Sequence, residues 1–231
     1  MKRFPVVFVP LCILILTMSL CVPAAFSQAP PSLREGIRQY QADNYEEAVE
    51  LFKKAREEAP QSTEAAFFLG MAYKQVQDYP NAAIHLRDAI TLSPPVKEAL
   101  VELIDVLYQT NKLDEAKKWI ALAEKDGIFP ARISFLKGMI FSKENNNQAA
   151  IAAFEAAKQF DPSLAQAADF QIGICFIKDS KLDMAKARFQ AAISHDPLSD
   201  LASFARQYQD MVEDKLYEER PLRLTLGIFT G

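Results

Sequence analysis

The sequence contains 231 residues, of which 50% are hydrophobic, and carries a formal net charge of −4. This length suits one ordinary domain or one short array of repeats, and the apolar content argues against a largely disordered chain. The mildly acidic balance argues against a nucleic-acid-binding groove, because such a groove needs a basic face to release counterions from phosphates.

Residues 1–27 have the three-part layout of a secretory signal peptide. Lys2 and Arg3 give a positive start, an apolar stretch follows, and Ala25-Phe26-Ser27 places small residues just before a cut ahead of Gln28. The apolar stretch is also long enough to cross a bilayer, so a retained membrane anchor is the alternative. The prolines within the stretch favour cleavage. We expect an exported, periplasmic protein, with association with the outer membrane as a further option.

Cleavage would leave Cys175 as the only cysteine. A single thiol forms no internal disulfide, so the exported chain is expected to be stable through packing alone. Cys175 stands in the apolar run Ile172 to Ile177. It is therefore predicted to be a small buried hydrophobe and not a reactive thiol.

The main pattern of the chain is a repeat of 34 or 35 residues. Small and large apolar residues return at fixed phases. The first alanine phase is Ala48, Ala82, Ala116, Ala150 and Ala185. The second is Ala55, Ala89, Ala123, Ala157 and Ala192. The large apolar phase between them is Phe52, Leu86, Ile120, Phe154 and Phe189. A glycine phase and a proline phase accompany them, as Gly36, Gly70, Gly138 and Gly173, and as Pro60, Pro94, Pro162 and Pro197.

Each unit of the repeat is predicted to be a helix, a tight turn and a second helix. Apolar residues recur at three- and four-residue steps, as in Ala48, Leu51, Phe52 and Ala55, which is typical of a buried helical stripe. A polar break separates the two helices, and its residues favour turns because short polar side chains compete for backbone hydrogen bonds. The breaks are Asp43-Asn44, Gln77-Asp78, Asn111-Lys112, Asn145-Asn146-Asn147 and Asp179-Ser180. Stacked pairs would cover each other's apolar faces as a right-handed, all-α solenoid.

This pattern resembles the tetratricopeptide repeat. Leu69-Gly70-x-x-Tyr73, followed by Ala82, Leu86, Ala89 and Pro94, matches the signature of that family. The expected repeat domain is 28–199, with units 29–62, 63–96, 97–130, 131–164 and 166–199. The third unit departs from the pattern, because it has Ile104 in place of the glycine and Ile128 in place of the proline, with a glycine at Gly127 instead. Its exit turn is therefore expected to be built differently.

The resemblance implies that the first helix of each pair lines a concave wall that holds partner peptides. The residues placed on that wall are Leu33, Ile37, Tyr40, Phe67, Met71, Lys74, Val101, Asp105, Tyr108, Phe135, Met139, Phe170 and Ile174. Family members that grip a C-terminal carboxylate use Lys and Asn at the phases of Leu33 and Ile37, and this sequence has neither residue at those phases, which argues against such a clamp. An apolar trough with methionines suits a hydrophobic segment or an amphipathic helix. The alternative is that several of these side chains pack between neighbouring first helices.

No constellation of residues indicates catalysis, a cofactor or a metal site. The two histidines, His85 and His195, stand apart and are interpreted as solvated side chains. No zinc, nucleotide-binding or nucleophile-elbow motif is present. The chain is therefore predicted not to be an enzyme, with protein or peptide partners and no nucleic acid.

After the repeats, residues 200–220 are predicted to form a closing helix with a polar outer face. Residues 221–231 change period: Leu222, Leu224, Leu226 and Ile228 alternate with other residues, which is typical of a strand. This tail resembles the entry strand of outer-membrane barrels that carry a periplasmic tetratricopeptide domain; a terminus without structure is the other reading. The function predicted first is an exported scaffold or adaptor. The alternative is the periplasmic arm of an outer-membrane protein that exports or assembles envelope components.

Overall fold

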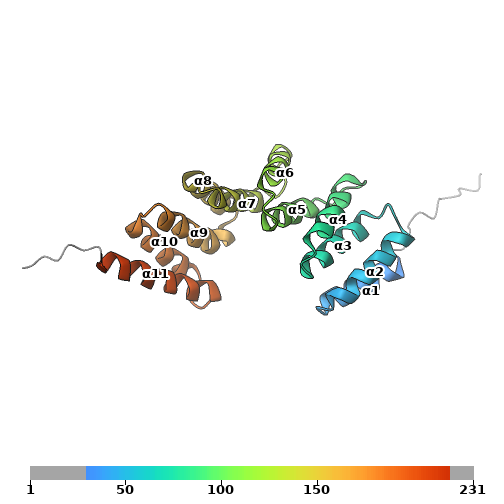
Figure 1. The fold of residues 1–231 in the computed structure, drawn as a ribbon, viewed down its shortest axis with the longest axis horizontal. Coiled ribbons are helices and arrows are strands. Elements are labelled where there is room, and N and C mark those ends of the chain that lie inside the picture. The colour runs from blue at the N-terminus through green and yellow to red at the C-terminus, as the bar shows by residue number, and fades with distance from the viewer. Residues whose placement is uncertain (1–29, 219–231) are drawn as a thin grey trace, which may run out of the picture.

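The computed structural model describes residues 30–218, which form eleven α-helices and one short 3₁₀ helix. The first ten α-helices make five helix–turn–helix pairs that stack into a curved array, and the eleventh closes it (Figure 1). The helices are α1 (Pro31–Gln41), α2 (Tyr45–Glu58), α3 (Thr63–Gln75), α4 (Tyr79–Thr91), α5 (Glu98–Gln109), α6 (Leu113–Lys125), α7 (Pro130–Lys143), α8 (Asn147–Phe160), η1 (Pro162–Leu164), α9 (Ala165–Lys178), α10 (Leu182–His195) and α11 (Asp200–Glu218). The predicted all-α solenoid is confirmed. The predicted signal peptide and terminal strand lie outside the described residues.

The turn inside each pair is built around one residue in the left-handed conformation. These residues are Asp43, Gln77, Asn111, Asn145 and Ser180, with φ between 57° and 61°. The residue that follows each of them donates its N–H to the carbonyl oxygen five residues earlier, as from Asp78 to Tyr73 at 2.8 Å. This is the hydrogen bond of a Schellman motif, which ends a helix within a few residues. Each polar break predicted from the sequence therefore contains a turn of the same geometry.

The small residues of the repeat lie where helices approach closely. All ten alanines of the two alanine phases are 0% exposed. A Cβ built on Gly70 would lie 2.7 Å from Cγ of Leu86, and one built on Gly138 would lie 2.6 Å from Cε1 of Phe154. No side chain fits at that distance. The glycine on the first helix therefore leaves the space that the large residue on the second helix of the same pair fills.

The third pair is the irregular one, as expected. Its first helix carries Ile104, fully buried, at the phase where the other first helices carry glycine. Its second helix ends at a left-handed glycine, Gly127 with φ 62°, and Ile128 donates its N–H to Ala123 O at 2.9 Å. In the other units the sequence places a proline after the second helix. In the third unit a Schellman turn ends that helix instead. The following helix, α7, begins at Pro130.

The apolar interior is divided into three clusters along the array. An N-terminal cluster spans α1 to α3, a middle cluster spans α3 to α7, and a C-terminal cluster spans α8 to α11. Each cluster uses residues from successive pairs, because one pair cannot cover its own apolar face. Within the described part of the chain, no helix combines the length and the apolar character needed to span a bilayer.

Candidate binding surface

The inner wall of the array is made by the first helices of the pairs. Successive first helices contact one another directly, α1 with α3, α3 with α5, α5 with α7 and α7 with α9. In Figure 1 the array is an arc, and α6 and α8 lie on its outer side relative to α5 and α7. The first helices therefore line the concave wall, where the partner-binding residues were predicted.

The predicted wall residues divide into two groups by exposure. Leu33 and Val101 are only 1% and 2% exposed, so these two side chains belong mainly to the interior. Burial leaves each of them little surface for a partner, because Leu33 packs into the N-terminal cluster and Val101 into the middle cluster. The other predicted residues keep part of their surface: Ile37, Tyr40, Phe67, Met71, Lys74, Asp105, Tyr108, Phe135, Met139, Phe170 and Ile174. Most of them also pack against one of the three clusters, which supports the alternative that these side chains pack between neighbouring helices.

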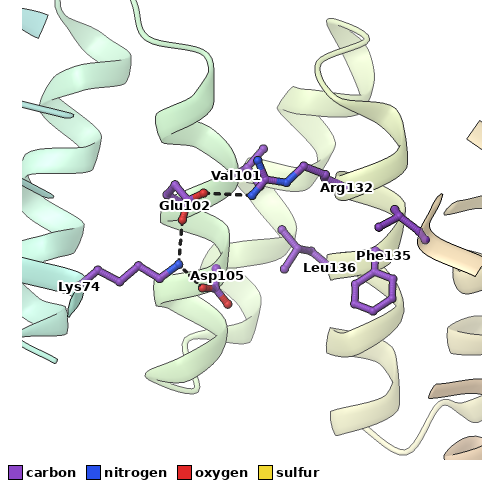
Figure 2. A pocket seen from close by; sticks show the side chains of 8 residues that line it. Lys74, Val101, Glu102, Asp105, Arg132, Phe135 and Leu136 are labelled. Carbon is purple, nitrogen blue, oxygen red and sulfur yellow. Dashed lines mark hydrogen bonds and ion pairs between the residues drawn. The ribbon is translucent and has the colours of Figure 1, made fainter. Parts of the chain in front are cut away.

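A hollow of about 200 Å³ lies on this wall between α3, α5 and α7. Figure 2 shows that side chains of all three helices point into it. Its lining is Lys74, Val101, Glu102, Asp105, Arg132, Phe135, Leu136 and Leu164. The predicted site residues Lys74, Val101, Asp105 and Phe135 are thus brought together at one place, which we call the central hollow.

Four charged side chains form the rim of the central hollow. Lys74 Nζ lies 2.8 Å from Glu102 Oε2 and 2.5 Å from Asp105 Oδ2, and Arg132 Nη2 lies 3.0 Å from Glu102 Oε1 (Figure 2). Sequence reasoning missed Glu102 and Arg132. The signal that could have found them is the pairing of opposite charges about one repeat apart on successive first helices.

The ion pairs fix the protonation of Lys74. Burial alone would lower its pKa, but the hydrogen bonds to Asp105 and Glu102 outweigh burial and raise the pKa above its ordinary value. Lys74 therefore stays charged and holds α3 to α5. The Arg132 side chain is 54% exposed and bonds Glu102 through Nη2, whereas Glu102 is only 13% exposed. Arg132 is accordingly the rim charge most available to a ligand, above a floor of apolar side chains.

The whole array matches known helical repeat proteins in its fold. The crystal structure of YrrB, described as a TPR protein with an unusual peptide-binding site, superposes with a TM-score of 0.59, at 20% identity over 78% of this chain and 92% of YrrB. MamA from Desulfovibrio magneticus RS-1 gives 0.65, at 17% identity over 74% of this chain and 99% of MamA. PilF from Pseudomonas aeruginosa gives 0.63, at 17% identity over 81% and 89%. This chain has the TPR fold.

A family model agrees with the repeat character of this TPR array. The model of the TT21 fifth ARM repeats domain matches residues 63–176, which span α3 to the end of α9. No curated protein matches the sequence. At the identities found, the solved structures establish the fold alone.

Both histidines of the TPR array are in contact with other side chains, so their interpretation as isolated residues is wrong. His195 is exposed, as expected, whereas His85 is partly buried. His85 stacks on Tyr73 with ring centroids 5.5 Å apart, and its buried Nδ1 has no hydrogen-bond partner. Burial lowers the pKa of His85. His195 Nε2 lies 3.0 Å from Asp169 Oδ2. Both contacts join residues of different helices, which the local sequence around each histidine does not reveal.

Asp169 is the centre of a buried ion cluster that joins α8, α9 and α10. Its side chain is 2% exposed, and its carboxylate accepts from Lys158 at 2.6 Å, from Arg188 at 2.9 Å and from His195. Burial would raise the pKa of Asp169, but these three hydrogen bonds lower it instead. Oδ1 is thus bound by the cations Lys158 and Arg188 and Oδ2 by the His195 ring, so the carboxylate of Asp169 joins its own helix to both neighbouring helices.

Cys175 is confirmed as a buried residue. Its side chain is 0% exposed, and Sγ lies 3.7 Å from Ser142 Oγ. Burial raises the pKa of the thiol. Among the described residues, no group of three or more His, Cys, Asp or Glu side chains is arranged to hold a metal ion.

Proposed function

We propose that the chain is an exported interaction scaffold that binds a segment of a partner protein along its concave wall. The observation that carries the proposal is the central hollow, where an apolar floor is open on the wall and surrounded by charged side chains. An apolar side chain of an extended or helical segment would fill such a hollow, and polar groups beside it would meet Arg132. The half-exposed aromatic residues on neighbouring first helices would extend the contact.

Binding along this wall is tested by site-specific photo-cross-linking in the native cell envelope. A photoreactive residue at Leu136, in the central hollow, should form an adduct with a defined partner. The same group at Lys118, exposed on the second helix α6, should not. Equal adducts from both positions would contradict the proposal.

A variant series separates binding from folding. The triple variant Phe67→Ser, Phe135→Ser and Phe170→Ser should abolish the adduct while its circular dichroism stays helical. Its matched control removes three exposed apolar side chains from second helices, as Ile84→Ser, Leu122→Ser and Met184→Ser, and should keep the adduct. Loss of helical signal in the first variant would show that the three phenylalanines are needed mainly for packing.

Export is supported by the composition of residues 1–27. The mature chain should begin near Gln28, which N-terminal sequencing or intact mass measurement checks. Export without cleavage would indicate a retained membrane anchor instead, and a chain found only in the cytoplasm would contradict the proposal.

A second candidate function is the periplasmic arm of an outer-membrane protein that exports or assembles envelope components. Its support is the alternation of apolar residues in 222–228, which is typical of a strand. Sequencing of the gene beyond the codon for Gly231 tests it. An in-frame stop codon directly after that codon would remove this candidate.

A further inference from the structure

The charged side chains at the rim of the central hollow form one row of alternating sign. The row runs from Asp105 to Lys74, then to Glu102 and then to Arg132, and Figure 2 shows the contacts that join them. Lys74 and Glu102 stand inside the row, and each has an opposite charge on both sides. Asp105 and Arg132 stand at its ends, and within the described part of the chain each of them pairs with one opposite charge. The row therefore has a negative end and a positive end.

The positive end of the row is the more exposed one. The side chain of Arg132 is 54% exposed and that of Asp105 is 26% exposed. Among the described residues, Arg132 donates only to Glu102, through Nη2. A guanidinium has five N–H donors in a fixed fork, so Nε and Nη1 remain to bind another acceptor. Glu102 offers little repulsion to a second carboxylate there, because Arg132 binds its Oε1 and Lys74 binds its Oε2.

The floor beside Arg132 has room for an aromatic ring. The central hollow measures about 200 Å³, and an apolar cavity of about 150 Å³ is enough to hold benzene. Phe135 and Leu136 of α7 supply part of its apolar lining. The ring of Phe135 is held in place by an edge-to-face contact with Phe154 of α8, with centroids 5.2 Å apart. This side of the hollow is thus fixed without a ligand, which lowers the cost of binding one.

Arg132 and the floor of the hollow lie one helical turn apart. Leu136 follows Arg132 by four residues on α7, which is a rise of about 6 Å along the helix axis. Side chains two residues apart in an extended chain are separated by about 6.6 Å and point to the same side. An extended segment can therefore place a ring in the hollow and a second side chain beside Arg132 at the same time.

We propose that the central hollow selects an extended segment in which an aromatic residue and an aspartate or glutamate stand two residues apart. The ring fills the hollow, and the carboxylate accepts from Nε and Nη1 of Arg132. Partly exposed aromatic residues continue the wall on both sides, as Phe67 on α3 and Phe170 on α9, so the carboxylate is assigned to a side chain within the segment and not to a chain end. Such selection rests on the proposed function, because it specifies which segments the scaffold holds.

The proposal is tested with capped peptides and the full chain at low ionic strength. The first peptide, acetyl-GSFSEGS-amide, has a phenylalanine and a glutamate two residues apart, and two others carry glutamine or lysine in place of the glutamate. Binding is followed through the backbone amide NMR shifts of residues 132–136. The glutamate peptide should bind about two- to fivefold more tightly than the glutamine peptide, as expected for one ion pair at a partly exposed site. The lysine peptide should bind most weakly.

Variants of Arg132 show whether this side chain reads the carboxylate. Arg132→Gln should remove the difference between the glutamate and glutamine peptides and leave both bound through the ring. Arg132→Lys keeps the charge but loses the fork, and should keep part of the difference. The matched control is Lys137→Gln, which removes a basic side chain of the same helix that pairs with Glu124 of α6 and does not line the hollow. It should leave the binding of all three peptides unchanged.

A fourth peptide separates the two sources of a carboxylate. Acetyl-GSF with a free C-terminal carboxylate presents the ring at a chain end, and tighter binding of this peptide than of the glutamate peptide would overturn the proposal in favour of a terminus. Equal binding of the three capped peptides, tightest binding of the lysine peptide, or no shift at residues 132–136 with any peptide would also overturn it. A cross-linked adduct from position 136 would in each of these cases leave the proposed scaffold function standing.

Discussion

A Cβ built on Gly173 would lie 2.6 Å from Cε1 of Phe189, closer than real Cβ atoms approach a neighbour. The Phe189 ring has little room to move away, because the rings of Phe170 and Tyr208 lie 5.7 Å and 5.6 Å from it. The glycine phase of the repeat is thus required by the aromatic residue opposite.

Gly173→Ala should therefore destabilise the array. Overpacking of a filled core costs about 1–3 kcal/mol, whereas alanine gains only about 1 kcal/mol over glycine in helix propensity. Denaturant unfolding measures the net loss. In a Phe189→Ala background the same substitution should become neutral or stabilising, because the ring is gone. An equal cost in both backgrounds would contradict the contact.

For two residues in the left-handed conformation, we expect substitutions to change the stability of the chain in opposite directions. Gln77 is exposed with φ 61°, so Gln77→Gly should stabilise the chain by about 1 kcal/mol, as glycine carries no Cβ penalty there. Gly127 has φ 62° and nothing within 4 Å of an added Cβ, so Gly127→Ala should destabilise by a similar amount through backbone conformation alone. Thermal unfolding of both variants checks the signs; two shifts in the same direction would contradict this account.

The Asp169 cluster predicts acid sensitivity. Because the pKa of the folded carboxyl is lowered, Asp169 stabilises the fold at pH values above its unfolded pKa of about 3.9, and this contribution is lost as pH falls through the lower folded pKa. Asp169→Asn should lower the free energy of unfolding by about 1–3 kcal/mol at pH 7, and should flatten its dependence on pH in the acid range. Urea unfolding across pH 2–7 measures both (roughly the range in which a carboxyl titrates).

A matched control is Asp114→Asn, which removes the carboxylate of an ion pair with Lys117 whose acidic side chain is 93% exposed. Exposed pairs contribute little. A loss of stability as large as that of Asp169→Asn would show that burial is not what makes the Asp169 cluster important.

Cys175 should react with thiol reagents only after unfolding. Its side chain is fully buried and its pKa is raised by that burial, so both access and thiolate formation are suppressed. With Cys12 and Cys21 replaced by serine, the native chain should show no fast thiol reaction at pH 7 and the unfolded chain should show one thiol. A cysteine at the exposed position Ser203 should react at once, as a positive control.

The fold could be predicted from the sequence because its determinants repeat. Ala82 and Ala89, like their equivalents in every unit, lie where helices approach closely and leave no room for a larger side chain. The same small residue at the same interval in five units is not expected by chance. The turns were found for a related reason, since residues such as Asn111 and Asn145 tolerate the left-handed conformation better than most.

The candidate site was predicted only in part, because it depends on contacts between units. Lys74, Asp105 and Phe135 follow from the phase of the first helices, but the Glu102 to Arg132 ion pair depends on how far side chains reach from α7 to α5. The contact of His195 was missed because its partner Asp169 is 26 residues away on another helix. Periodicity shows which side of a helix is buried, and it carries no information on pairs of that kind.

The division of the interior into three clusters has a consequence for how a bound partner would act. An array whose clusters are joined only through shared helices loses structure from its ends, one cluster at a time. A segment lying across the central hollow touches α3, α5 and α7, all of which contribute to the middle cluster, and therefore stabilises that cluster more than the two end clusters. Such a ligand would raise the unfolding temperature of the middle cluster, because it binds only the folded form of these helices.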